Sequence, residues 1–322
     1  MDLCAVKHNV QELQICLSNI QEPFSLPHCL FTCVTLTKLD LTMPCILKLP
    51  PTICLSKLKI LVLKGVSFSD EHSTQKLFSG FPVLEELCLD DCRWMNLKVV
   101  SICAPKLSSL MIQDPYKKRW SDSDNCQVTI LGVSLESFYY TGEFFNEYSL
   151  HKLALLVEAY INVCGSRTRP RLVANRMYTL LIGFSNAKEI MLTSFAVEGV
   201  SLSTDCEKVD SILDPVPPCF LSQLKCIKVG YYNGDEKELS AVKILLKNAV
   251  ALDRIVISFS KNFAGYLEKR GKLFLFQQAY AVEPERTTFE RYKPRSTAST
   301  LFSFAVRISM LHQSKISAFY GI

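Results

Sequence analysis

The sequence predicts an α/β fold of the solenoid type, in which repeats build a curved parallel sheet with helices or loops on its convex side. Three observations predict it. One phrase recurs: an apolar residue, two variable residues, Leu, one variable residue and Leu. The phrase is clearest at residues 81–89 and returns at residues 55–63, 104–112 and 221–229. A single repeat cannot bury its own apolar edge, so the phrase predicts a stacked array.

The second observation is the Leu-x-Leu alternation, and the third is its spacing. In a strand, alternation points both leucines inward and the middle residue outward. From Leu13 to Leu110 the steps between such pairs are 26, 22, 26 and 23 residues, followed by 28, 21, 31, 37 and 28. The first steps match the roughly 20–29 residues of leucine-rich repeats. The predicted pairs are Leu13/Ile15, Leu39/Leu41, Leu61/Leu63, Leu87/Leu89, Leu110/Ile112, Phe138/Tyr140, Ala159/Ile161, Ile190/Leu192, Ile227/Val229 and Ile255/Ile257.

The other half of a repeat is clearest at residues 68–82. Ser69 is a suitable N-cap, and Asp70 and Glu71 place negative charge in the first turn of a helix, where the helix dipole favours it. Gly80 then predicts a left-handed C-cap, and Pro82 prevents the helix from continuing. The repeat is therefore expected to run strand, turn, helix, turn and strand.

Several phrases are specific enough to compare with a known family. Residues 29–41 contain Cys-Leu-Phe-Thr-Cys-Val-Thr-Leu-Thr-Lys-Leu-Asp-Leu, and residues 49–61 begin Leu-Pro-Pro and end Leu-Ser-Lys-Leu-Lys-Ile-Leu. Residues 66–71 contain Val-Ser-Phe-Ser-Asp-Glu, and residues 77–87 contain Leu-Phe-Ser-Gly-Phe-Pro-Val-Leu-Glu-Glu-Leu. These phrases resemble the repeats of plant F-box/leucine-rich-repeat (LRR) proteins, with Phe81 where that family usually has Cys.

A second resemblance covers residues 216–258. This segment opens with Val-Pro-Pro-Cys-Phe-Leu, and its pattern predicts a strand at 224–229, a helix at 236–248 and a strand at 252–258. It resembles the FBD domain that closes F-box/LRR/FBD proteins. We therefore expect irregular leucine-rich repeats over 1–200, a linker over 201–215, an FBD domain over 216–275 as a cap, and an unassigned tail over 276–322.

The chain departs from this family pattern in three places. The F-box that should precede the repeats is missing, few residues separate the last repeat from the FBD segment, and residues 281–322 fit neither repeat nor cap. A truncated paralogue or an incomplete gene model would explain all three.

Composition excludes several classes of protein. Hydrophobic residues make up 48% and charged residues 21% of the chain, which is typical of a globular protein. The net charge of +5 is too mild for nucleic-acid binding, and the apolar stretches are too short to cross a membrane. The 14 cysteines are scattered and often lie in apolar runs, which favours thiols of a reducing compartment. We expect a cytoplasmic or nuclear protein.

No arrangement of residues predicts catalysis or a cofactor. The histidines are isolated, and the Cys29/Cys33 and Cys88/Cys92 spacings are better explained as core or surface thiols than as a metal site. Residues 265–272 depart from a phosphate-binding loop in spacing and lack its Ser/Thr. Two basic segments are interpreted as loops between repeats: residues 116–120, and a run of arginines at positions 167, 169, 171 and 176 whose Pro170 should break a helix.

The outward residues of the strands form the predicted binding surface, because the concave strand face is the usual recognition surface of such arrays. Tyr139 and Tyr160 should be neighbours there and form a hot spot. The candidate partner-binding residues are Asp40, Val62, Cys88, Met111, Tyr139, Tyr160, Met191 and Lys228.

The predicted function is non-catalytic protein recognition. The resemblance implies the substrate-binding part of an SCF-type (cullin–RING) ubiquitin ligase receptor, which would contact a Skp-type adaptor only if the full-length product carries an F-box. The alternatives are a truncated gene model with no independent function, or a decoy or scaffold protein. The target protein is not predicted, and no nucleic-acid, membrane or cofactor partner is expected.

Overall fold

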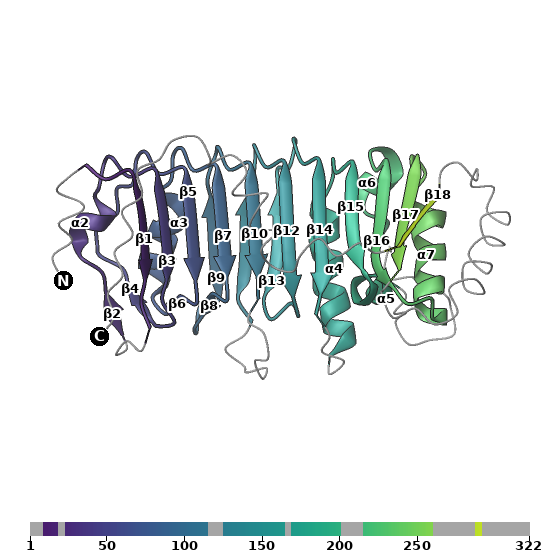
Figure 1. The fold of residues 1–322 in the computed structure, drawn as a ribbon, viewed down its shortest axis with the longest axis horizontal. Helices are drawn as coiled ribbons and strands as arrows, with labels where there is room; N and C mark the ends of the chain where they lie inside the picture. Colours follow the sequence, from purple (N-terminus) through teal and green to yellow (C-terminus); the bar gives the residue numbers. More distant parts are fainter. Residues whose placement is uncertain are drawn as a thin grey trace.

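The main body of the protein is one long parallel sheet. The computed structural model describes residues 9–18, 23–114, 125–164, 169–200, 215–259 and 287–291. Figure 1 shows the strands of this sheet side by side along the long axis of the molecule, following one another in sequence order. The 11 strands are β1 (Glu12–Cys16), β3 (Lys38–Thr42), β5 (Ile60–Lys64), β7 (Glu86–Asp90), β10 (Ser109–Gln113), β12 (Ser137–Gly142), β14 (Glu158–Val163), β15 (Glu189–Thr193), β16 (Cys226–Tyr232), β17 (Arg254–Phe259) and β18 (Thr287–Arg291).

The paired apolar residues set the register of this sheet. Leu13 lies beside Leu39 and Ile15 beside Leu41, and the same register continues through every predicted pair to Ile255. No side chain of these pairs is more than 8% exposed. The predicted α/β leucine-rich-repeat solenoid is therefore confirmed, with each pair buried against the pair of the next strand.

Short strands and helices form the second layer behind the sheet (Figure 1). Three small parallel sheets lie there, β2–β4, β6–β8 and β9–β11–β13, so several repeats carry a second strand where the sequence predicted a helix. Val99, Val100 and Ile102 in β9 illustrate the reason, since β-branched residues in alternation favour a strand. The strands are β2 (Phe24–Ser25), β4 (Leu47–Lys48), β6 (Ser67–Phe68), β8 (Arg93–Trp94), β9 (Val99–Cys103), β11 (Gln127–Leu131) and β13 (Glu147–His151).

Helices α2 (His28–Phe31) and α3 (Glu71–Ser79) belong to the N-terminal repeats. Helix α3 was predicted, but both of its caps differ from the prediction. Its N-cap is Asp70, whose carboxylate accepts a hydrogen bond from the Ser73 N–H at 2.8 Å, and the predicted Ser69 lies one residue too early. Gly80 has a φ of −93° and is not left-handed. Its N–H bonds the Leu77 carbonyl at 3.2 Å, so a tight right-handed turn ends the helix.

Helices α4 (Pro170–Gly183) and α5 (Ser194–Val200) cover the sheet toward its C-terminal end. Pro170 begins α4 and does not break a helix, because the first turn does not use the N–H that proline lacks. Arg176 is buried, contrary to the loop interpretation, and it donates to the carbonyl oxygens of Phe144 and Phe145 at 2.7 and 2.6 Å. The basic segment at 116–120, Arg167 and residues 265–272 lie outside the described residues.

The C-terminal unit contains α6 (Pro218–Ser222), β16, α7 (Glu236–Asn248) and β17. The predicted helix is confirmed at both ends, and the two predicted strands begin two residues later than expected. Residues 287–291 form β18, which pairs with β17, so the prediction that 281–322 carries no repeat-like element is wrong for these five residues. The division of the chain into domains stays a prediction.

No disulfide bond joins any two of the described cysteines. In the described part of the chain no helix is long and apolar enough to cross a membrane.

A buried polar network joins the two layers around Asp114. One carboxylate oxygen accepts from the Tyr148 hydroxyl at 2.8 Å, and the other accepts from the Phe145 N–H at 3.1 Å and from the Tyr140 hydroxyl. Burial raises the pKa of Asp114, and the two hydroxyls oppose that rise. Gly142 is needed beside it, because a Cβ at that position would lie 2.4 Å from the Asp114 Cβ.

We expect the Asp114→Ala substitution to destabilise the protein by about 3 kcal/mol, because it leaves buried hydroxyl and N–H donors without an acceptor. Urea unfolding followed by circular dichroism measures this change. Asp253→Ala is the control, since this exposed carboxylate makes only a 3.9 Å ion pair. Equal midpoints for the two variants would contradict the role given to Asp114.

Glu238 has a similar role in the C-terminal unit. Its fully buried carboxylate accepts from the N–H groups of Asn233 and Gly234 at 2.9 and 2.6 Å and from the Ser194 hydroxyl, and it completes a capping box with Asp235.

We expect Glu238→Ala to lower the stability by about 2 kcal/mol, because it removes the capping box of α7 and leaves buried N–H and hydroxyl donors without an acceptor. The same unfolding measurement on Glu236→Ala, an exposed residue of the same turn, should show almost no change. A larger loss for Glu236→Ala than for Glu238→Ala would contradict this account.

Candidate functional site on the strand face

The strand face is the side of the main sheet that points away from the second layer. Each strand presents a first, a central and a third outward position, which flank and separate its buried pair. Parallel pairing in register places equal positions of neighbouring strands about 4.8 Å apart. The outward residues therefore form three continuous rows along the sheet.

The predicted site residues all occupy the central row. Register pairing makes each a neighbour of the next, in the order Asp40, Val62, Cys88, Met111, Tyr139, Tyr160, Met191 and Lys228. Asp40 is buried, and the others are half-buried between the side chains of adjacent strands. The structure thus brings these residues together, while their role in binding stays a prediction.

Two aromatic side chains stand side by side in this row. The ring centroids of Tyr139 and Tyr160 are 6.4 Å apart, with ring planes tilted by 43°. Burial is the main cause that raises the pKa of Tyr139, followed by its hydrogen bond to Glu158. The hydroxyl of Tyr139 therefore stays protonated and acts as a donor.

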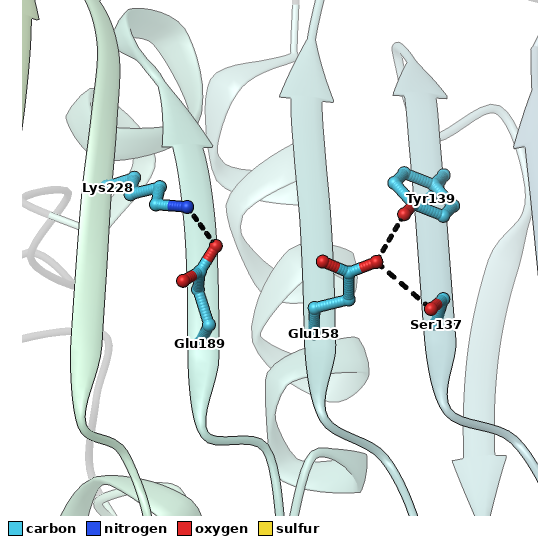
Figure 2. A network of polar contacts seen from close by, with 5 residues as sticks. All are labelled: Ser137, Tyr139, Glu158, Glu189 and Lys228. Carbon is cyan, nitrogen blue, oxygen red and sulfur yellow. Dashed lines mark hydrogen bonds and ion pairs between the residues drawn. The ribbon is translucent and has the colours of Figure 1, made fainter. Parts of the chain in front are cut away.

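Polar contacts run along the first row beside the tyrosines (Figure 2). Glu158 accepts from the Ser137 hydroxyl at 3.0 Å and from the Tyr139 hydroxyl. Glu189, the neighbour of Glu158 on the next strand, forms an ion pair with Lys228 of the central row. These contacts hold both carboxylates on the strand face.

Asp40 is the charged residue in the N-terminal half of the central row. Its Oδ2 accepts from the Gln14 amide at 3.4 Å, whereas its Oδ1 is buried and has no hydrogen-bond partner among the described residues. Burial raises the pKa of Asp40, while Lys64, Lys38 and the Thr42 side chain oppose that rise. The carboxylate therefore has an unused acceptor.

The thiol of Cys88 is a poor nucleophile in this setting. Burial raises its pKa to about 12, and the nearby Asp90 carboxylate adds to the rise. The thiolate is the reactive form of cysteine, so the central row offers no activated nucleophile at neutral pH.

Three acidic residues outside the strand face lie close enough together to resemble a cation site. Ligand atoms of Glu198, Asp235 and Glu238 lie within 4.8 Å of one another. Glu238 already accepts several N–H and O–H donors there, and the Glu238 N–H bonds Asp235 at 2.8 Å. The closeness of Asp235 and Glu238 is therefore explained by the helix cap of α7.

The sequence-based prediction missed Ser137, Glu158 and Glu189, which lie in the first row together with Glu86. Register pairs Glu86 with Ser109 and Ser109 with Ser137, and the row continues to Glu158 and Glu189. Counting two positions back from each central residue would have found them.

Comparisons with known proteins find family matches for the repeats and for the C-terminal unit. The family model described as FBD-associated F-box protein At5g56370, LRR repeats, matches residues 3–139, and the FBD model matches residues 214–257. No solved structure matches the chain significantly.

Individual relatives come from Arabidopsis thaliana. The chain is 28% identical to FBD-associated F-box protein At4g10400, over 85% of the chain and 74% of the relative. It is 26% identical to F-box/FBD/LRR-repeat protein At5g56420, over 82% and 70%. A shorter match of 36% identity joins 33% of the chain to 24% of Putative F-box/FBD/LRR-repeat protein At4g00315. The chain is therefore similar to FBD-associated F-box/LRR proteins of Arabidopsis thaliana, in its repeats over residues 3–139 and in its FBD segment over residues 214–257.

Proposed function

We propose that the protein is a non-catalytic recognition module that holds a target protein on its strand face. The observation that carries the proposal is the continuous central row, in which polar, thioether and aromatic side chains lie in register without an activated nucleophile. Rigid scaffolds of this kind bind partners through extended surfaces. Half-buried tyrosines add large contact area at low entropic cost.

The names of the relatives suggest the setting of this recognition. They are F-box proteins, so we propose that the bound protein is a substrate for an SCF-type ubiquitin ligase, with the repeats as the substrate-binding part. The described cysteines form no disulfide with one another, which supports a reducing compartment, the cytoplasm or the nucleus. No observation favours the alternatives of a decoy, a scaffold or a chain without independent function.

Site-specific photo-crosslinking tests the proposal. A photoreactive phenylalanine analogue at Met111, on the strand face, should crosslink a discrete partner in plant extract. The same analogue at Thr129, on the outward side of the second-layer strand β11, should not, because that position lies away from the strand face.

Competition separates specific from accidental crosslinks. Excess unlabelled wild-type protein should remove the Met111 product, whereas a Tyr160→Ala, Met191→Ala double variant should compete at least about tenfold less well, as expected when hot-spot contacts are truncated. A specific product from Thr129 with none from Met111, or full competition by the double variant, would contradict the proposal.

A further inference from the structure

The strand face carries a charge opposite to that of the chain. Over the ten strands from β1 to β17 its outward positions hold six carboxylates and four cations, a net charge of −2, in a chain with a net charge of +5. Complementary charge steers association and excludes partners of the wrong sign. The carboxylates are Glu12, Asp40, Glu86, Asp90, Glu158 and Glu189, and the cations are Lys38, Lys64, Lys228 and Arg254.

One carboxylate in the C-terminal half of the face lacks a counter-charge. Lys228 pairs with Glu189, whereas Glu158 accepts from the hydroxyls of Ser137 and Tyr139, which are neutral donors (Figure 2). Among the described residues Glu158 makes no ion pair. Two neutral donors fix its position without cancelling its charge.

The tyrosine pair completes a surface suited to a cation. Tyr160 lies at the central position of β14, the strand that carries Glu158. Tyr139 lies at the central position of the adjacent strand β12, and the two rings are 6.4 Å apart. An ammonium or guanidinium group is attracted to the face of such a ring, and a carboxylate at its edge adds direct charge pairing. Guanidinium matches both contacts best, because it is planar and donates two parallel hydrogen bonds.

Asp40 provides a second, independent acceptor on the same face. The residue is only 9% exposed, and its Oδ1 has no donor among the residues that the structure describes. A buried acceptor without a partner costs free energy that a bound donor would recover. Asp40 lies five strands from Glu158 in the sheet order, which corresponds to about 24 Å, the length of an extended segment of about seven residues.

We propose that the strand face holds a basic segment of the target protein, with an Arg or Lys side chain seated on Glu158, Tyr139 and Tyr160 and a second donor reaching Asp40. The inference rests on the proposed function, since it gives the chemistry of the target at the same face. Its occupant is a protein segment, because Val62, Met111 and Tyr139 provide apolar contact area in the row between the two acceptors.

Selection of peptides on the purified full chain tests this directly. The probe is a phage-displayed library of random peptides of about twelve residues. We expect the enriched pool to contain an excess of Arg and Lys, and the selected peptide, measured by fluorescence anisotropy, to bind more weakly as salt rises. An enriched pool without that excess, or a selection that returns no binder, overturns the proposal.

Matched variants locate the contact. Glu158→Gln keeps the oxygen that accepts from the two hydroxyls and removes only the charge, so it should weaken binding of the selected peptide about tenfold, as expected for a lost charge-assisted hydrogen bond. Asp40→Asn should weaken it less, since an amide keeps one acceptor. Glu136→Gln is the control, because Glu136 is exposed and precedes β12, off the strand face.

The outcomes also separate this inference from the proposed function. If Tyr160→Ala abolishes peptide binding while Glu158→Gln leaves it unchanged, the strand face is the binding surface and the basic-segment inference is wrong. If neither substitution affects a bound peptide, both proposals fail. Thermal melting of each variant should match that of the wild type, which shows that losses of binding do not come from unfolding.

Discussion

In-register parallel pairing is the constraint on which the rest of the structure depends. Each strand buries two apolar side chains, and those side chains are covered by the equivalent pair of the adjacent strand, as Leu87 is by Leu61 and Leu110. A slip by one residue would exchange the buried and outward sides of a strand. Because the array has no other way to cover these edges, the register is strongly specified at every repeat.

The same register creates the candidate site. Residues from distant parts of the sequence become neighbours only because equal positions align, so Glu158 reaches Ser137 and Glu189 reaches Lys228. The site therefore needs no dedicated loop or cavity. Buried networks such as the one around Asp114 hold the two layers together behind it, which keeps the outward rows rigid.

The sequence predicted the main sheet well because its signal is strictly local. The Leu-x-Leu alternation has the period of a strand, and helix α7 carries the acidic first turn of a good helix start at Glu236 and Glu238. The second layer was harder to predict. Whether residues 99–103 form a strand or a helix depends on pairing with β11, which no local pattern shows. Arg176 was misinterpreted as exposed because charge favours solvent unless carbonyl groups surround it, and those come from residues 144 and 145.

The candidate site likewise has features that the sequence predicts and features that only the tertiary structure shows. Each residue of the central row stands between the two members of an apolar pair, so the sequence alone locates it. The structure places all eight predicted residues in that row. The polar contacts of Glu158 and the unused oxygen of Asp40 depend on side-chain conformations and on residues of the adjacent strands. Such features follow from tertiary packing, so they could not be obtained from spacing alone.

Carboxylate footprinting of the chain with and without its bound target tests the central claim most directly. In this measurement exposed carboxylates are coupled to an amine and quantified by mass spectrometry. The account predicts that the target protects Glu158 and Glu189 on the strand face and leaves Glu136 and Glu71 unchanged. Protection of Glu71 or Glu136 with undiminished labelling of Glu158 and Glu189 would contradict it.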